Sequence, residues 1–327
     1  MTKFGLFILL LTIIACKEKS VPAIPILIDT DANNELDDQH ALAYAFFNAE
    51  TFDIKGITVN ATFGGGDAAQ QMVEAERVMQ LCNVSGKYPL IKGATLNFDT
   101  LSTLITMDSF DGSEAVDFII SEVMKMAEQN QKLILVPIGK LTNIALALMK
   151  KPEIKEHIRI VWLGSNYPDP GEYNLENDIP AMNYILSLNV PFEMVTVSYG
   201  KLTGSDFVKV TPAIMEEKMK GKGPVDAPVN GRNGGTFTSF GDYSINLFSH
   251  IDLYGDPPSR ALFDLVALAV TKNGSWGQKR TVKSPIMADS IWVTNDKINR
   301  DVIVWENFDR DAILEDFFKS VDEASKQ

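Results

Sequence analysis

Acidic residues gather between a short apolar run and a helical stretch near the start of the chain. Positions 29–38 hold five acidic residues and two asparagines, in the order Asp29-Thr30-Asp31-Ala32-Asn33-Asn34-Glu35-Leu36-Asp37-Asp38. Aspartates this close repel one another unless protons or a cation compensate their charge. Hard divalent cations prefer oxygen ligands, and Ca²⁺ takes roughly six to eight of them. The pattern therefore predicts a site for a divalent cation or another polar ligand.

Two other motifs place acidic residues close together in a similar way. The calcium loop of helix-loop-helix sensors needs Gly at its sixth position and Glu at its twelfth. Counted from Asp29, those positions hold Asn34 and His40, which excludes that motif. Asp37 and Asp38 would also suit a helix N-terminus through the macrodipole alone. Because Asp29 and Asp31 also close the preceding strand, we favour the metal or ligand site.

Strand-like and helical stretches alternate along the chain and would position these acids. Ile26–Ile28 reads as a buried strand and Ala41–Phe46 as a packed helix, so the acids follow the carboxyl end of a strand, where open α/β sheets bind ligands. Further strands are expected at Ile54–Val59, Leu133–Ile138, Ile158–Leu163, Phe192–Val197, Ile286–Val293 and Val302–Trp305. Helices are expected near Ala68–Leu81, Ser113–Gln129, Thr142–Lys150, Ala181–Leu188 and Arg260–Thr271. This alternation predicts an α/β fold with an open, mostly parallel sheet and helices on both faces.

One segment interrupts the alternation. Residues 221–235 are rich in Gly, Pro and Asn and read as a flexible loop or lid, flanked by less certain helices around Thr211–Lys220 and Thr236–His250. Arg232 in this segment could reach a ligand, although a solvent-exposed loop is the stronger interpretation. No convincing linker divides the chain, so residues 26–327 are expected to form a single domain.

Composition narrows the range of partners. The 327 residues carry a formal charge of −13. Without a basic stripe to meet phosphates, nucleic acid is not expected as a partner, whereas a free nucleoside or a neutral sugar remains compatible. Cys16 and Cys82 are the two cysteines, too few for a disulfide framework or a zinc site.

The N-terminus has the features of an export signal. Lys3 precedes the apolar run Phe4–Ile14, which has the length of a signal-peptide core and is too short to span a bilayer stably. Ile13-Ile14-Ala15-Cys16 resembles the lipobox of bacterial lipoproteins. The resemblance implies removal of residues 1–15, lipidation of Cys16, a tether over residues 16–25 and anchoring to the bacterial cell envelope. A plain secretory signal cleaved nearby is the alternative.

The acidic stretch resembles the signature Asp-Thr-Asp-Pro-Gly-x-Asp-Asp of the inosine-uridine type nucleoside hydrolases, with a two-residue insertion in this chain. Three more segments are similar to the family in the same order. They are Val136-Pro137-Ile138-Gly139-Lys140-Leu141-Thr142-Asn143-Ile144-Ala145, Glu172-Tyr173-Asn174 with Asp178, and Phe263-Asp264-Leu265-Val266-Ala267. The resemblance implies a nucleoside hydrolase-like fold that hydrolyses the N-glycosidic bond of ribonucleosides or related N-ribosides. Ribose and free base would be the products.

The resemblance also implies a role for individual residues. It makes Ca²⁺ the cofactor, with four ligand positions: Asp31, Asp38, the Ile138 carbonyl and Asp264. Asp31 would also take a proton from the attacking water as general base. Ribose hydroxyls would be held by Asp37, Asn60, Asn166, Glu172 and Asn174. For Asn60, a simple cap at the end of a strand is an equal alternative.

Protonation of the leaving base is the least certain role. Many family members carry a His where this chain has Phe263. His250, near Tyr243 and Tyr254, lies in the segment where the family places groups around the base and is the candidate acid, while His40 is expected to be a helix-surface or core-edge group.

A different class of function stays open. The protein could be a non-catalytic surface lipoprotein that binds ribosides or sugars through calcium, and a hydrolase of another glycoside is a weaker option. Ribose release with and without chelator separates the first two. A homo-oligomer is possible.

Overall fold

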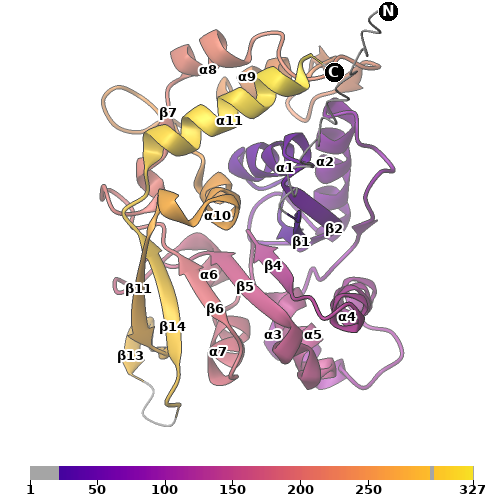
Figure 1. The fold of residues 1–327 in the computed structure, drawn as a ribbon, viewed down its shortest axis with the longest axis vertical. Helices are drawn as coiled ribbons and strands as arrows, with labels where there is room; N and C mark the ends of the chain where they lie inside the picture. The colour runs from indigo at the N-terminus through magenta and orange to yellow at the C-terminus, as the bar shows by residue number, and fades with distance from the viewer. Residues whose placement is uncertain (1–21, 295–297, 327) are drawn as a thin grey trace, which may run out of the picture.

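Eight strands form one sheet at the centre of the computed structural model, which describes residues 22–294 and 298–326 (Figure 1). Their order is β11-β14-β6-β5-β4-β1-β2-β3, and neighbours run parallel except β11, which is antiparallel to β14. The strands are β1 (Ile24–Thr30), β2 (Phe52–Val59), β3 (Leu90–Ile91), β4 (Leu133–Pro137), β5 (Ile158–Leu163), β6 (Phe192–Val195), β11 (Gln278–Lys283) and β14 (Asp301–Glu306). The predicted open, mostly parallel sheet is confirmed.

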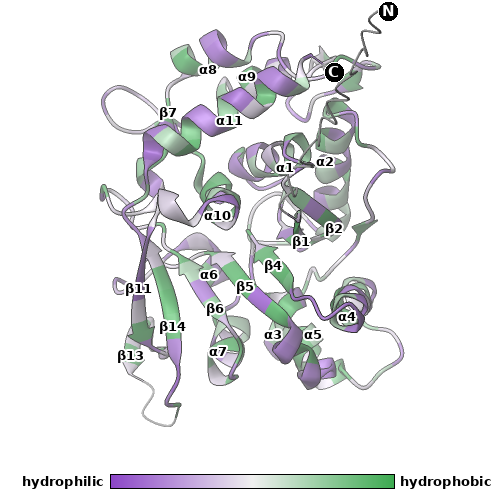
Figure 2. Ribbon diagram, in the orientation of Figure 1, coloured by the Kyte–Doolittle hydropathy of each residue, from purple (hydrophilic) through white to green (hydrophobic). Residues whose placement is uncertain are grey.

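Helices cover both faces of the sheet, as predicted. Below it in Figure 1 lie α3 (Phe98–Leu101), α4 (Ser113–Glu128), α5 (Thr142–Lys150) and α7 (Ile179–Ser187). Above it lie α1 (Asp37–Phe47), α2 (Ala68–Leu81), α8 (Pro212–Met219), α9 (Phe240–Phe248), α10 (Phe263–Lys272) and α11 (Arg310–Ala324). Side chains of β1 alternate between the layers, because Ile26 and Ile28 pack above and Leu27 below. Figure 2 shows the outer helices α4 and α11 as amphipathic, with hydrophilic and hydrophobic residues interspersed.

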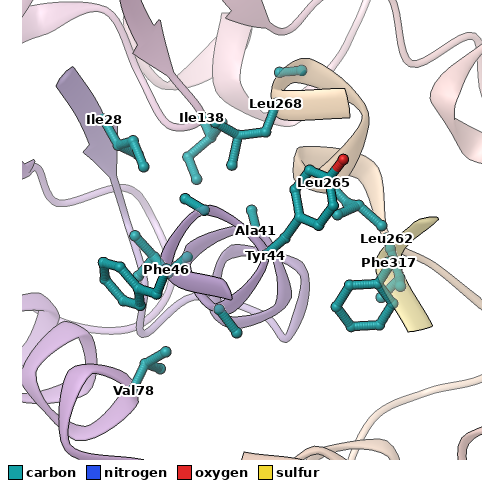
Figure 3. Packing of buried hydrophobic residues seen from close by; sticks show 14 of the residues in the cluster. Ile28, Ala41, Tyr44, Phe46, Val78, Ile138, Leu262, Leu265, Leu268 and Phe317 are labelled. Carbon is teal, nitrogen blue, oxygen red and sulfur yellow. The ribbon is translucent and has the colours of Figure 1, made fainter. Parts of the chain in front are cut away.

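Helix α1 is buried on almost every side. All residues from Asp37 to Phe46 are buried, although a surface helix would expose one face. Figure 3 shows Ala41 and Tyr44 of this helix among Ile28 of β1, Leu265 of α10 and Phe317 of α11. Surrounded in this way, α1 has little freedom to move, so the two aspartates in its first turn are fixed in position.

His40 belongs to this core. Its Nδ1 atom lies 2.5 Å from the Leu36 carbonyl oxygen and its Nε2 atom 2.6 Å from the Ser244 hydroxyl. Three aromatic rings, those of Phe240, Phe248 and Phe317, meet the imidazole edge to face. Burial lowers the pKa of His40 to about 4, which keeps the ring neutral. His40 therefore has a structural role and lies deeper than the expected helix surface or core edge.

Two of the predicted elements differ from the observed ones. The single strand expected at Ile286–Val293 is a hairpin of β12 (Pro285–Ala288) and β13 (Ile291–Thr294), turned through Asp289 and Ser290, which both have positive φ. The helix expected from Arg260 begins at Phe263, because Arg260–Ala261 forms strand β10 with β7 (Lys209–Val210).

Other elements were missed or only partly predicted. Strand β11 and helix α11 were not predicted. The segment at 221–235 contributes β8 (Val229–Asn230), which pairs with β9 (Thr236–Phe237). A regular strand pair therefore replaces part of the expected flexible loop.

The N-terminal predictions fall mostly outside the described residues. Cys16 and the signal segment at 1–15 are not among them. Strand β1 already begins at Ile24, inside the segment expected to be a tether. Within the described part of the chain, no helix combines the length and apolar character needed to cross a bilayer.

Replacing Phe317 with alanine should lower the free energy of unfolding by about 3–5 kcal/mol, because it removes a fully buried ring that packs on α1. Phe318→Ala is the matched control, since the neighbouring ring is only partly buried and should cost clearly less. Urea denaturation of both variants measures the difference. Equal losses would show that α11 does not dock through Phe317.

Candidate functional site

The site lies where the strand order of the sheet reverses. From β1 the chain moves outward through β2 to β3, and then returns to start β4 on the other side of β1. Asp31 follows the end of β1, and Ile138 follows the end of β4. The carboxyl ends of strands at such a switch point form the crevice in which open α/β sheets bind ligands.

Three carboxylates from distant parts of the chain converge there. Asp37 and Asp38 lie in the first turn of α1, and Asp264 lies in the first turn of α10. One oxygen of each lies within 4.8 Å of those of the other two, so the group could hold a metal ion. The N-terminal ends of both helices point their positive dipole ends at these acids, which favours ionised carboxylates.

A cavity of about 470 Å³ opens over the cluster. Seven of the residues predicted for the site line it: Asp31, Asp37, Asp38, Ile138, Glu172, Asn174 and Asp264. The structure thus brings together the predicted metal ligands and three of the predicted sugar-binding residues. Their individual roles remain predictions.

Burial and mutual repulsion favour the protonated form of these acids when no cation is bound. Burial raises the pKa of Asp31 to about 7 and that of Asp37 to about 7, and neighbouring carboxylates contribute to both shifts. The pKa values of Asp38 and Asp264 are raised as well, for the same two reasons. A bound divalent cation would remove this penalty, so the donor set fits such an ion.

Short hydroxyl side chains fix two of the carboxylates. The Thr62 hydroxyl donates to Asp31 at 2.5 Å, and the Thr30 hydroxyl donates to Asp38 at 2.5 Å. Each bond satisfies one oxygen and leaves the other oxygen of the group available.

Asp29 and Asn60 lie behind the cavity. Asp29 accepts hydrogen bonds from Thr58 at 2.6 Å, from Asn143 at 2.8 Å and from Asn60 at 3.0 Å. Asn60 is completely buried and is not among the residues lining the cavity. This placement agrees with the alternative in which Asn60 caps the end of a strand, and the contact with ribose stays a prediction.

Glu172 and Asn174 shape the opposite wall. The Glu172 carboxylate accepts from the backbone N–H groups of Ser165, Asn174 and Leu175, at 2.7 to 2.9 Å. The Asn174 side-chain amide donates to the carbonyl of Ile138 at 3.0 Å. These bonds tie the loop after β5 to the end of β4 and so fix the Ile138 carbonyl beside the acids.

Two predicted residues lie away from the cavity. His250 is exposed after the last turn of α9, with its Nδ1 atom 2.8 Å from the Asn246 carbonyl oxygen, so its ring faces solvent. The Asn166 side-chain oxygen accepts from the Tyr199 backbone N–H at 3.4 Å, within the surface loop after β5. Neither residue lines the cavity in the described part of the chain. The roles predicted for them receive no support from their placement.

The two-residue insertion between Asp31 and Asp37 is held firmly in place. The Arg232 guanidinium donates to the carbonyl oxygens of Asn33 at 3.0 Å and Glu35 at 3.1 Å. The Tyr173 hydroxyl donates to the Asn34 side chain at 3.1 Å, and the Glu35 carboxylate pairs with Arg260. The interpretation of Arg232 as part of a solvent loop was wrong, since its side chain supports the acidic loop.

Several residues that line the cavity were not predicted. They are Glu35, Arg260, Tyr199 and Lys209. For Glu35, the only sign of a place in the cavity wall was its position in the two-residue insertion. Arg260 was not predicted because its segment was expected to be helical, whereas it forms strand β10 before the helix begins.

The chain is similar in sequence to nucleoside hydrolases. A family model described as "Inosine-uridine preferring nucleoside hydrolase" matches residues 26–313. The non-specific ribonucleoside hydrolase RihC of Salmonella paratyphi A is 27% identical over 210 residues, which are 58% of this chain and 67% of that protein. The pyrimidine-specific ribonucleoside hydrolase RihA of Shewanella oneidensis is 28% identical over 191 residues, 52% of this chain and 58% of that protein.

Solved structures share the fold. A plant nucleoside hydrolase, PpNRh1, superposes with a TM-score of 0.67 at 17% identity, covering 92% of this chain and 99% of its own. A purine-preferring ribonucleoside hydrolase from Gardnerella vaginalis has a TM-score of 0.66 at 20% identity, with the same coverage.

In the presence of chelator, the protein should become more stable as the pH falls from about 8 to about 6.5. The folded pKa values of Asp31 and Asp37, about 7, lie above the unfolded value of roughly 4. The folded state therefore keeps protons that the unfolded state releases, and stability is gained as the pH falls through 7. Thermal unfolding at each pH measures the effect.

Asp37→Asn serves as the control, because removing one titrating group should reduce the gain. Saturating divalent cation should raise the melting temperature more at pH 8 than at pH 6.5, since it competes with those protons. A melting temperature that does not change with pH in chelator would contradict the electrostatic account of the cluster.

Proposed function

Since the chain belongs to the inosine-uridine preferring nucleoside hydrolase family, whose enzymes hydrolyse N-glycosyl bonds, we propose that it cleaves ribonucleosides or related N-ribosides into ribose and free base. One observation of the structure carries this proposal. Asp38 and Asp264, far apart in sequence, meet at the floor of a cavity whose walls hold further oxygen donors. A ribose ring presents hydroxyl groups that such a set can bind.

The reaction passes through a sugar with oxocarbenium character, so the site must position a water and hold the ring. Asp31 faces the cavity and takes a proton from the attacking water as general base. Asp37, Glu172 and Asn174 hold the ribose hydroxyls and thereby fix the anomeric carbon relative to the water. The Thr62 hydroxyl orients the Asp31 carboxylate for this task.

Ca²⁺ is the proposed cofactor. The candidate ligands are the carboxylates of Asp31, Asp38 and Asp264 and the carbonyl of Ile138, which are all oxygen donors and suit a hard cation with many ligands. When bound, the ion supplies positive charge to ribose oxygens and lowers the pKa of a water. The raised pKa values of the cluster support this assignment, because the acids are poorly compensated without a cation.

We also propose that the protein is exported and anchored by a lipid on Cys16, at the bacterial cell envelope. The apolar run followed by Ile13-Ile14-Ala15-Cys16 supports this proposal. The catalytic body would then act on nucleosides outside the cytoplasm.

Asp38→Ala should abolish calcium binding and turnover together, because it removes a carboxylate from the centre of the cluster. Calcium binding is measured by calorimetry, and turnover by release of ribose from a nucleoside panel with and without chelator. Asp53→Ala, at an exposed position paired with Lys55 on β2, is the control and should retain both.

Three outcomes would contradict the proposal in different ways. Retention of both properties in Asp38→Ala would place the metal elsewhere. Equal ribose release in chelator would rule out a calcium requirement. Calcium-dependent binding of nucleosides without ribose release would favour the non-catalytic surface lipoprotein.

Cys16→Ser should move the protein from the membrane fraction to the soluble fraction of the cells that express it, because the thiol that carries the lipid is gone. Fractionation followed by immunoblotting measures the shift, with Cys82→Ser as the control. Cys82 is a buried thiol, so this control should leave the protein in the membrane fraction. A wild-type protein found only in the soluble fraction would rule out the anchor.

A further inference from the structure

A guanidinium group forms part of the cavity wall close to Phe263. Arg260, in the short strand β10, lines the cavity and is 8% exposed. Its terminal nitrogen Nη2 contacts the Glu35 carboxylate, while neither its buried Nε atom nor its other terminal nitrogen, Nη1, has a hydrogen-bond partner among the described residues. Arg260 therefore retains donor capacity beside the cavity after Glu35 is satisfied.

One aromatic ring lies against this guanidinium, and two more line the same cavity. The Tyr254 ring lies 5.4 Å from the centre of the Arg260 guanidinium, and the Tyr199 ring meets Phe263 edge to face at 5.9 Å. Tyr199 is 49% exposed and Tyr254 is 58% exposed, and both line the cavity. Exposed ring faces next to a cation suit a flat, electron-rich partner such as a nucleobase.

Neither Phe263, at the position of the family's His, nor His250, the predicted acid, can protonate a departing base at this wall. Phe263 has no proton to give, and His250 faces solvent. Lys209 also lines the cavity, but its ammonium is 3.0 Å from the carboxylate of Asp206 and is paired with it. Among the described residues, Arg260 is thus the cation best placed to meet negative charge at this wall.

We propose that Arg260 contacts the departing base and stabilises the negative charge that develops on it, in place of a group that donates a proton. This inference rests on the proposed function. The bond between the anomeric carbon and the base nitrogen breaks, and its electron pair stays on that nitrogen. The oxygen of water forms the new bond to the anomeric carbon, and its proton passes to Asp31.

The guanidinium does not give up its proton in this step. Arginine stays protonated in proteins, so Arg260 contributes charge and hydrogen bonds only. The base leaves as an anion and takes a proton from solvent. Substrates whose bases form stable anions, or carry an acceptor next to the glycosidic nitrogen, are therefore the class this wall favours.

Comparing substrates whose leaving groups need different amounts of help tests the role of Arg260. The uracil of uridine leaves poorly without assistance, whereas 4-nitrophenyl riboside releases a stable nitrophenolate. Arg260→Met should lower kcat/KM for uridine roughly 10²–10³-fold, the usual cost of losing one aligned donor to a developing anion. The same variant should lower kcat/KM for 4-nitrophenyl riboside far less. Arg260→Lys should show an intermediate effect on uridine, because it keeps the charge but not the planar fork.

Two controls separate this role from a structural one. Arg280→Met removes an arginine that pairs with Glu306 on β14, outside the cavity, and should leave both rates unchanged. Calcium titration shows whether Arg260→Met keeps the acidic cluster intact. If calcium binding is lost in Arg260→Met, the test uses Arg260→Lys instead, and compares its kcat/KM for uridine with its kcat/KM for 4-nitrophenyl riboside.

The outcomes are distinct. An equal loss on both substrates would overturn the role of Arg260 while leaving the proposed function in place. A wild-type protein that hydrolyses neither riboside would overturn the proposed function and this inference with it. A loss confined to uridine supports both.

Discussion

Repulsion between buried carboxylates is the constraint on which the rest of the site depends. Asp31, Asp37, Asp38 and Asp264 meet in a region with little water, where each negative charge raises the free energy of the others. The fold opposes this repulsion with the N-terminal ends of α1 and α10 and with hydroxyl donors from neighbouring loops. These contributions are partial, so the cluster keeps bound protons or is compensated by a cation.

Hydrophobic packing is what allows such an unfavourable arrangement to persist. Helix α1 lies between β1, α2, α10 and α11, and its side chains from Asp37 to Phe46 are buried (Figure 3). Each buried apolar side chain contributes about 1.5–3 kcal/mol, so the layer can offset the electrostatic cost at its edge. The cavity wall is built differently, because short strands and loops supply Arg260, Tyr254 and Glu172. A rigid core thus holds the acids, and short strands and loops surround the position expected for the base.

Sequence patterns predicted the parts of the molecule that depend on periodicity and local spacing. Alternating apolar runs located α2, α5 and β5 at their observed bounds, and the acids before α1 indicated the site. The hairpin at β12 and β13 was missed because its turn is two residues within one apolar run. Arg232 and Arg260 could not be assigned, since their partners lie in the loop at 33–35, nearly two hundred or more positions earlier. Asn60 was ambiguous because an amide after a strand can face either a ligand or a neighbouring aspartate.

The distance in sequence between the acids of α1 and Asp264 has a consequence for how the molecule matures. During synthesis the first turn of α1 leaves the ribosome long before α10 exists, and Arg232 also follows much later. A nascent chain that ends before α10 has an acidic loop without its guanidinium support and without its third carboxylate. The proposed ion site is therefore complete only once synthesis has passed Asp264, so a product that ends before α10 lacks one of the proposed ligands.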